Sequence, residues 1–162
     1  MLVDSPHFHK GNNPITDQYY SDQDFVDLLH AKTFAEVYSI AYRVIEHMPE
    51  GLVQVCGPIS TGGVGSIEGN IDRMDSVIKK LQGEGWNIFD QMYVEGPFQR
   101  IRYSPEYEHK DGHGDILNDF YLPLFKSGKI KGLYFMKDWQ SSKGAQWEHD
   151  KGVELGLEIY YE

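Results

Sequence analysis

The chain has a single cysteine, few basic residues and no long apolar run. One cysteine excludes an intramolecular disulfide, which favours a reducing compartment and predicts a cytoplasmic protein. The formal net charge of −10 disfavours a nucleic-acid groove or a polybasic membrane contact, because polyanions would be repelled. No stretch has the length and apolarity of a membrane span, and the first residues lack a signal-peptide pattern. A small anionic ligand stays compatible with this charge, since backbone N–H groups act at short range.

Metal and thiol chemistry also have little support. The cysteine, Cys56, lies in an apolar run, so we predict a small core residue rather than a nucleophile. His7 and His9 have a spacing that metals use, but no acidic or cysteine ligands cluster with them. The histidine pair at 109–113 is interrupted by glycine, which breaks a helix there. We therefore predict no metal site.

The composition is that of a folded chain, with 40% apolar and 14% aromatic residues in 162. Residues 1–50 are predicted to form an irregular arm and two helices, from about 22 and from 34 to 47. These helices would pack on the main domain or against a second subunit. Residues 51–162 are predicted to form one α/β domain.

The main domain begins with a predicted buried strand at 52–56. The loop 57–66 follows with four glycines and three hydroxyl residues, so its backbone can approach a ligand closely. A helix over 68–82 and a strand over 86–89 complete a βαβ unit. The loop has neither a Walker A sequence nor a strict GxGxxG spacing, and is by itself a weak phosphate signal.

The middle of the domain is less regular. Residues 90–114 are a long insertion, and a loop of this length is usually functional or mobile. Two interpretations are open: Arg100 and Arg102 are the charged contacts of a loop that closes over a base or phosphate, or 98–103 is an ordinary edge strand. A helix is predicted over 115–125, bent or shortened by Pro123.

The stretch 139–148 connects a predicted strand at 132–136 to a predicted helix at 146–155, and a closing strand is expected at 157–161. Such a junction directs unpaired N–H groups and the positive end of the helix dipole at one point, which suits an anion. An N-capped surface helix, in which Glu148 merely favours the first turn, fits equally well. Alternation of strands and helices predicts a doubly wound, mainly parallel sheet with ligands at the carboxyl ends of its strands.

Three segments together resemble a known family: Cys56-Gly-Pro-Ile-Ser60, Asp119-Phe-Tyr-Leu-Pro-Leu124 and Trp139-Gln-Ser-Ser-Lys-Gly-Ala-Gln-Trp-Glu148. They are similar to motifs of the nucleoside 2-deoxyribosyltransferase-like fold, which includes nucleotide N-glycosidases and small, often phage-encoded relatives. The resemblance covers roughly residues 52–160. It implies a flavodoxin- or Rossmann-like sheet, no cofactor, a small nucleoside or nucleotide as substrate, and a homo-oligomer.

The resemblance also implies roles for particular residues. Glu148 would attack the sugar, and Asp119, or nearby Asp115, would hydrogen-bond the sugar hydroxyls or assist proton transfer to the base. The substrate and any 5′-phosphate would be bound by Gly57, Pro58, Ile59, Ser60, Trp139, Ser142 and Gly144. For Trp139, stacking on the base and packing in the core are both open.

One departure from the family pattern bears on catalysis. Lys131 stands where relatives usually have an aspartate, just before the strand that precedes the last motif. The alternative function is therefore a non-catalytic protein of the same fold that senses or sequesters a nucleotide. A third possibility is an interaction protein in which residues 22–47 mediate assembly.

Overall fold

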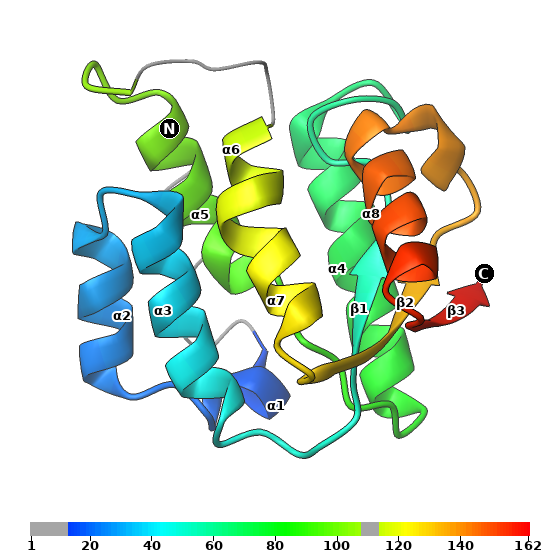
Figure 1. Cartoon of the computed structure of the whole chain (residues 1–162), viewed down its shortest axis with the longest axis horizontal. Helices are drawn as coiled ribbons and strands as arrows, with labels where there is room; N and C mark the ends of the chain where they lie inside the picture. The colour runs from blue at the N-terminus through cyan, green and yellow to red at the C-terminus, as the bar shows by residue number, and fades with distance from the viewer. Residues whose placement is uncertain (1–12, 108–113) are drawn as a thin grey trace. The chain divides into compact units, whose positions relative to one another are not determined.

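The computed structural model describes residues 13–107 and 114–162, which fall into two compact units (Figure 1). The helical unit consists of the chain up to Met48 together with Gln91–Leu124. The sheet unit consists of Pro49–Asp90 and Phe125–Glu162. Residues 91–124 thus group with the N-terminal helices. The division into domains 1–50 and 51–162 stays a prediction from the sequence.

The sheet unit has a small, all-parallel sheet and is α/β in class. Its strands are β1 (Leu52–Cys56), β2 (Ile130–Phe135) and β3 (Glu158–Tyr161), in the order β1-β2-β3. The predicted strand at 86–89 is reduced to one parallel bridge between Ile88 and Val53. Two hydrogen bonds form this bridge, from the N–H of Val53 to the carbonyl of Asn87 at 2.9 Å and from the N–H of Phe89 to the carbonyl of Val53 at 3.0 Å.

Two helices accompany this sheet, α4 (Ile67–Gly83) behind it and α8 (Lys143–Glu154) in front of it in Figure 1. Leu133 of β2 faces α8, and a Cβ on Gly152 would lie 2.7 Å from its Cδ1 atom. Glycine at this position therefore lets the helix approach the strand closely. On the other face, Trp86 packs edge-on against Tyr134.

The helical unit contains α1 (Pro14–Asp17), α2 (Asp22–His30), α3 (Phe34–Ile45), α5 (Met92–Arg102) and α6 (Gly114–Ile116). A π-helical segment (Leu117–Tyr121) follows α6 and leads into α7 (Leu122–Lys126). Ser21 caps α2 in a reciprocal capping box and Thr33 caps α3, as expected where helices begin with hydroxyl residues. Phe98 lies 4.8 Å from Phe120 and 5.6 Å from Phe34 between ring centroids, so aromatic rings form the core of this unit.

The prediction of an insertion loop or edge strand within 90–107 is wrong, because α5 occupies most of it. Val94, Phe98 and Ile101 recur at helical spacing and are buried. Their burial outweighs the cost of about 3 kcal/mol for a proline inside a helix, here Pro97. Arg100 donates to the backbone carbonyl of Leu28 at 2.7 Å, which ties α5 to α2.

The helix predicted over 115–125 is present but changes its period. Pro123 has no N–H group, and just before it the N–H of Leu122 donates to the carbonyl of Leu117 instead of following the α-helical pattern. The histidines at 7, 9, 109 and 113 lie outside the described residues.

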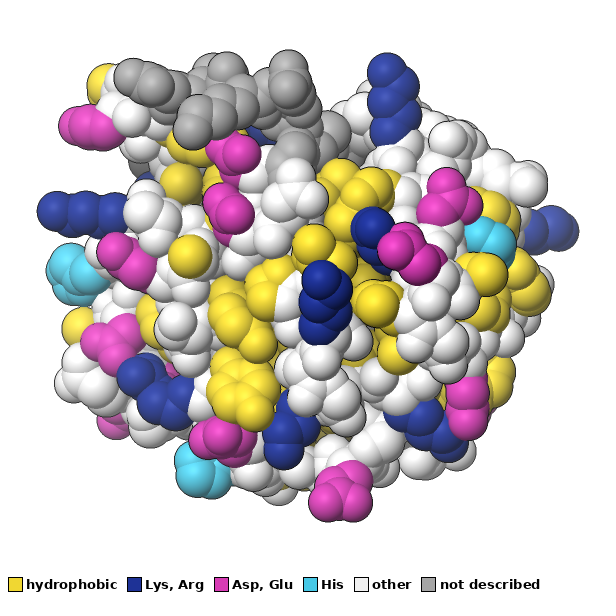
Figure 2. Space-filling view, in the orientation of Figure 1, with side chains coloured by type: hydrophobic (Ala, Val, Ile, Leu, Met, Phe, Trp, Pro, Cys, Tyr) yellow, Lys and Arg dark blue, Asp and Glu magenta, His cyan; other side chains and the backbone are white. Residues whose placement is uncertain are grey.

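Charged side chains of both signs lie on the surface. On the face drawn in Figure 2, basic side chains alternate with acidic and neutral ones rather than forming one basic patch. Across residues 13–107 and 114–162, no helix combines the length and apolarity that crossing a bilayer requires.

Candidate functional site

The carboxyl ends of β1 and β2 bring the loop 57–66 and the stretch 139–148 together. The N–H of Met136 donates to the carbonyl of Cys56 at 2.9 Å, which extends the pairing of the two strands to their last residues. A Cβ on Gly57 would lie 2.6 Å from the sulfur of Met136. Glycine at this position therefore lets the chain turn away from β1 directly over β2.

Ser141 joins the glycine-rich loop to the start of α8. Its hydroxyl accepts a hydrogen bond from the N–H of Gly63 at 2.9 Å. A Cβ on Gly62 would lie 2.2 Å from the carbonyl oxygen of Ser141, and both glycines have positive φ, 72° and 63°. Only glycine fits this close approach and this backbone conformation. Lys143 adds a longer contact, since its N–H donates to the hydroxyl of Thr61 at 3.4 Å.

Asn70, in the first turn of α4, fixes the same loop from its other side. Its amide nitrogen donates to the carbonyls of Ile59 at 3.0 Å and Gly62 at 3.1 Å. Its amide oxygen accepts from the N–H of Val64 at 3.0 Å, and the side chain is buried. This residue is absent from the sequence prediction. Its only signal there was a polar amide at the start of a helix that follows a glycine-rich loop.

The helix α8 begins three residues earlier than predicted, at Lys143. Ser142 is its N-cap, and the Ser142 hydroxyl accepts from the N–H of Ala145 at 3.2 Å. Gly144 therefore lies in the first turn of α8 instead of in the turn before it. The cap part of our surface-helix interpretation is confirmed.

The surface part of that interpretation is wrong, because Glu148 is only 7% exposed. Its Oε2 atom accepts a hydrogen bond from the side-chain nitrogen of Gln54 at 2.5 Å. The thiol of Cys56 approaches the same oxygen at 3.5 Å. Gln54 and Cys56 are two residues apart in β1, so both side chains point to the face that α8 covers.

Cys56 is fully buried, which confirms the prediction of a core cysteine. Burial raises the pKa of its thiol well above the ordinary value, and the negative charge of Glu148 and the hydrogen bond to that carboxylate raise it further. The thiol therefore stays protonated at neutral pH and acts as a weak donor to Glu148.

The remaining predicted residues of the sheet unit divide into two groups. Gly57, Pro58, Ile59 and Ser60 leave β1 and begin the loop that Asn70 fixes. The ring of Trp139 instead stacks on His149 at 4.5 Å between centroids and lies 5.1 Å from Phe135. These contacts favour the packing interpretation of Trp139.

Lys131 lies near the amino end of β2, the end opposite to the two loops. Its ammonium group is 3.6 Å from the carboxylate of Glu158, and both side chains are half exposed. Such a pair contributes little to stability. Within the sheet unit, Lys131 is therefore remote from the carboxyl ends of the strands.

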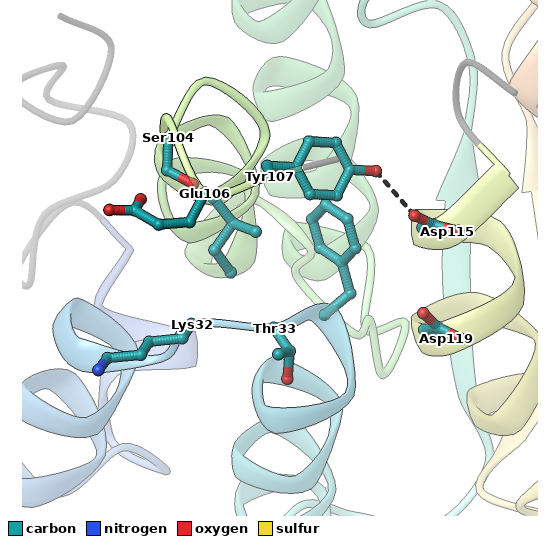
Figure 3. Close-up of a pocket in the computed structure, with 9 residues that line it drawn as sticks. Lys32, Thr33, Ser104, Glu106, Tyr107, Asp115 and Asp119 are labelled. Carbon is teal, nitrogen blue, oxygen red and sulfur yellow. Dashed lines mark hydrogen bonds between the residues drawn. The ribbon is translucent and has the colours of Figure 1, made fainter. Parts of the chain in front are cut away.

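Asp119 belongs to the helical unit, where it lies in the π-helical segment. It lines a pocket of about 230 Å³ together with Asp115, one helical turn away (Figure 3). The hydroxyl of Tyr107 donates to Asp115 at 3.1 Å across this pocket. The other lining residues are Lys32, Thr33, Phe34, Ile101, Ser104 and Glu106.

Among the described residues, no group of three histidine, cysteine or carboxylate side chains could hold a metal ion. No family model, curated protein or solved structure matches the chain.

Proposed function

We propose that the chain is a nucleoside or nucleotide N-glycosidase or 2-deoxyribosyltransferase with a doubly wound, Rossmann-like sheet. The observation that carries the proposal is the buried carboxylate of Glu148, which accepts a hydrogen bond from Gln54 of β1. Glu148 lies in α8, the helix whose first turn contacts the glycine-rich loop. A buried carboxylate costs free energy, and such a cost is common where a carboxylate acts in chemistry.

In the proposed reaction, an oxygen of Glu148 forms a bond to C1′ of the sugar while the bond from C1′ to the base nitrogen breaks. The electron pair of that bond leaves with the base, which takes up a proton. Water then attacks C1′, the ester bond breaks to restore the carboxylate, and the proton lost by water replaces the one taken by the base. A second base in place of water would give transfer instead of hydrolysis.

A 5′-phosphate would bind where the glycine-rich loop meets the first turn of α8. The proposed donors are the N–H groups of Ser60 and Gly144 and the hydroxyl of Ser142, because the N–H of Ser142 already donates to the carbonyl of Trp139 at 3.0 Å. The helix has 12 residues, so its dipole adds a favourable field for an anion there. The local field acts at short range, and the net charge of −10 does not oppose a small ligand strongly.

The role of Asp119 on the sugar hydroxyls stays a prediction from the family resemblance. Its π-helical segment supports it, because such segments occur often at functional positions. Asp119→Asn and Asp115→Asn are compared for base release, since the two carboxylates line one pocket. A larger loss of activity in Asp119→Asn than in Asp115→Asn would assign the role to Asp119. The cytoplasmic location and the homo-oligomer likewise stay proposals. Light scattering on the purified protein measures the oligomeric state.

The test is release of free base from nucleosides and nucleoside monophosphates, with ribose and deoxyribose, followed by chromatography. We expect Glu148→Gln to lower the rate on the order of 10³-fold or more, as loss of a nucleophile does. Glu154→Gln is the matched control, because Glu154 is exposed at the end of the same helix. Full activity in Glu148→Gln, or no base release from any of these substrates, would refute the proposal.

The alternative is a nucleotide-binding protein without turnover. It is supported by the same burial of Glu148, because a carboxylate held by Gln54 can also serve to fix α8 on β1, and the first turn of α8 contacts the glycine-rich loop. Calorimetry that detects nucleotide binding to a protein that releases no base would favour this function.

A further inference from the structure

We propose that Gln54 is a positioning residue that orients the carboxylate of Glu148 and favours its ionised form. The inference rests on the proposed function, in which Glu148 is the nucleophile. Gln54 stands in the middle of β1 and is completely buried. No motif of the sequence marks it, since it lies before the Gly-Pro segment and 94 residues from Glu148.

The geometry restricts what the amide can do. Its nitrogen lies 2.5 Å from Oε2 of Glu148, and 3.7 Å from the sulfur of Cys56. A carboxylate only accepts hydrogen bonds when ionised, so the amide nitrogen, and not the amide oxygen, must face it. Because the strand is fixed in the sheet by its pairing with β2, this donor holds one carboxylate oxygen in a defined place.

The same orientation turns the amide oxygen of Gln54 away from Glu148. The amide oxygen of Gln54 is buried and accepts no hydrogen bond from the described residues. Buried acceptors without a partner are rare and unfavourable. The contact that ties the Gln54 amide to the proposed site is therefore the one that its nitrogen makes with Glu148.

The contact fits each step of the proposed reaction. With Oε2 held by Gln54, the other carboxylate oxygen forms the bond to C1′, and Oε2 becomes the carbonyl oxygen of the ester. When water breaks the ester, negative charge returns to the carboxylate, and the Gln54 nitrogen stabilises that charge as it develops. Cys56 is the titratable group of β1 at this carboxylate, and it contributes no charge because its thiol stays protonated.

The first readout is kinetic. Gln54→Met keeps the length of the side chain and removes the donor, and we expect kcat to fall about 10- to 100-fold, the effect of one hydrogen bond to a charged group. The acidic limb of the pH–rate profile should move to higher pH, because the ionised nucleophile has lost a donor. Gln82→Met is the matched control, since Gln82 is a buried glutamine of α4 in the same unit. Gln54→Asn, which keeps the amide but shortens its reach, serves if the methionine variant does not fold.

The second readout does not need turnover. In NMR spectra of protein labelled with ¹³C at the glutamate carboxyls, the signal of Glu148 is assigned as the one that disappears in Glu148→Gln. We expect its titration midpoint to be higher in Gln54→Met than in wild type and unchanged in Gln82→Met. A moved midpoint in a protein that releases no base refutes the proposed function and leaves the Gln54 contact standing. An unmoved midpoint, or an unchanged kcat in an active enzyme, overturns the inference.

Discussion

Replacing Asn70 by alanine tests whether one side chain orders the glycine-rich loop. The amide makes three hydrogen bonds to the loop, with distances of 3.0, 3.1 and 3.0 Å. Each is worth about 1 kcal/mol net, so their summed loss is about 3 kcal/mol. Water can replace part of it, because Ile59 and Gly62 are half-buried, and alanine regains about 0.5 kcal/mol of helix propensity. We therefore expect the free energy of unfolding to fall by about 2 kcal/mol.

Thermal unfolding measures this change. For a chain of 162 residues, a loss of about 2 kcal/mol corresponds to a fall in Tm of about 4–8 °C. Asn87→Ala is the matched control, because Asn87 is exposed and makes one long hydrogen bond of 3.4 Å. Its effect should be within about 0.5 kcal/mol. Nucleotide binding by calorimetry should weaken in Asn70→Ala and stay unchanged in Asn87→Ala, since only the former frees the loop.

Asn70→Asp sharpens the comparison. The carboxylate has nearly the same shape and still accepts from Val64, but it cannot donate to the two carbonyls and places a negative charge beside them. We expect it to be at least as destabilising as alanine. The reasoning is refuted if Asn70→Ala lowers Tm no more than Asn87→Ala does, or if the aspartate variant is as stable as wild type.

Three further predictions concern other parts of the chain. Burial raises the pKa of Glu95 from 4.5 to about 7, so the folded protein loses stability as pH rises from about 4.5 to 7. Glu95→Gln removes this effect. In urea titrations it should raise the free energy of unfolding at pH 8 by up to about 3 kcal/mol, and by less at pH 5. Gly57→Ala should cost about 1–3 kcal/mol, measured by thermal melts, because its Cβ would meet the Met136 sulfur. Arg100→Ala should lower stability by about 1–3 kcal/mol, because it loses the hydrogen bond to the Leu28 carbonyl, and should leave nucleotide binding by calorimetry unchanged. Equal free energies of unfolding for wild type and Glu95→Gln at pH 5 and at pH 8 would contradict the first expectation. An unchanged Tm in Gly57→Ala would contradict the second, and weakened nucleotide binding in Arg100→Ala the third.

Local patterns were sufficient where one residue type leaves few conformational choices. The apolar run at 52–56 and the closing segment at 157–161 are strands β1 and β3, as predicted. The hydroxyl residue before α8 is its cap, as the sequence indicated. The sequence prediction failed within 90–107, which we expected to be an insertion or an edge strand. Buried apolar residues form α5 there, although Gly96 and Pro97 lie inside the helix.

The sequence by itself determined the composition of the two loops, the strands that lead into them and the position of Glu148 in the last helix. These follow from periodicity and turn chemistry, which depend on near neighbours. Only the tertiary structure decided that Glu148 is buried against Gln54, and that Asn70 fixes the loop. The physical reason is sequence distance: the Gln54–Glu148 bond joins residues 94 apart, and it forms only once the pairing of β1 with β2 has brought α8 over the strand.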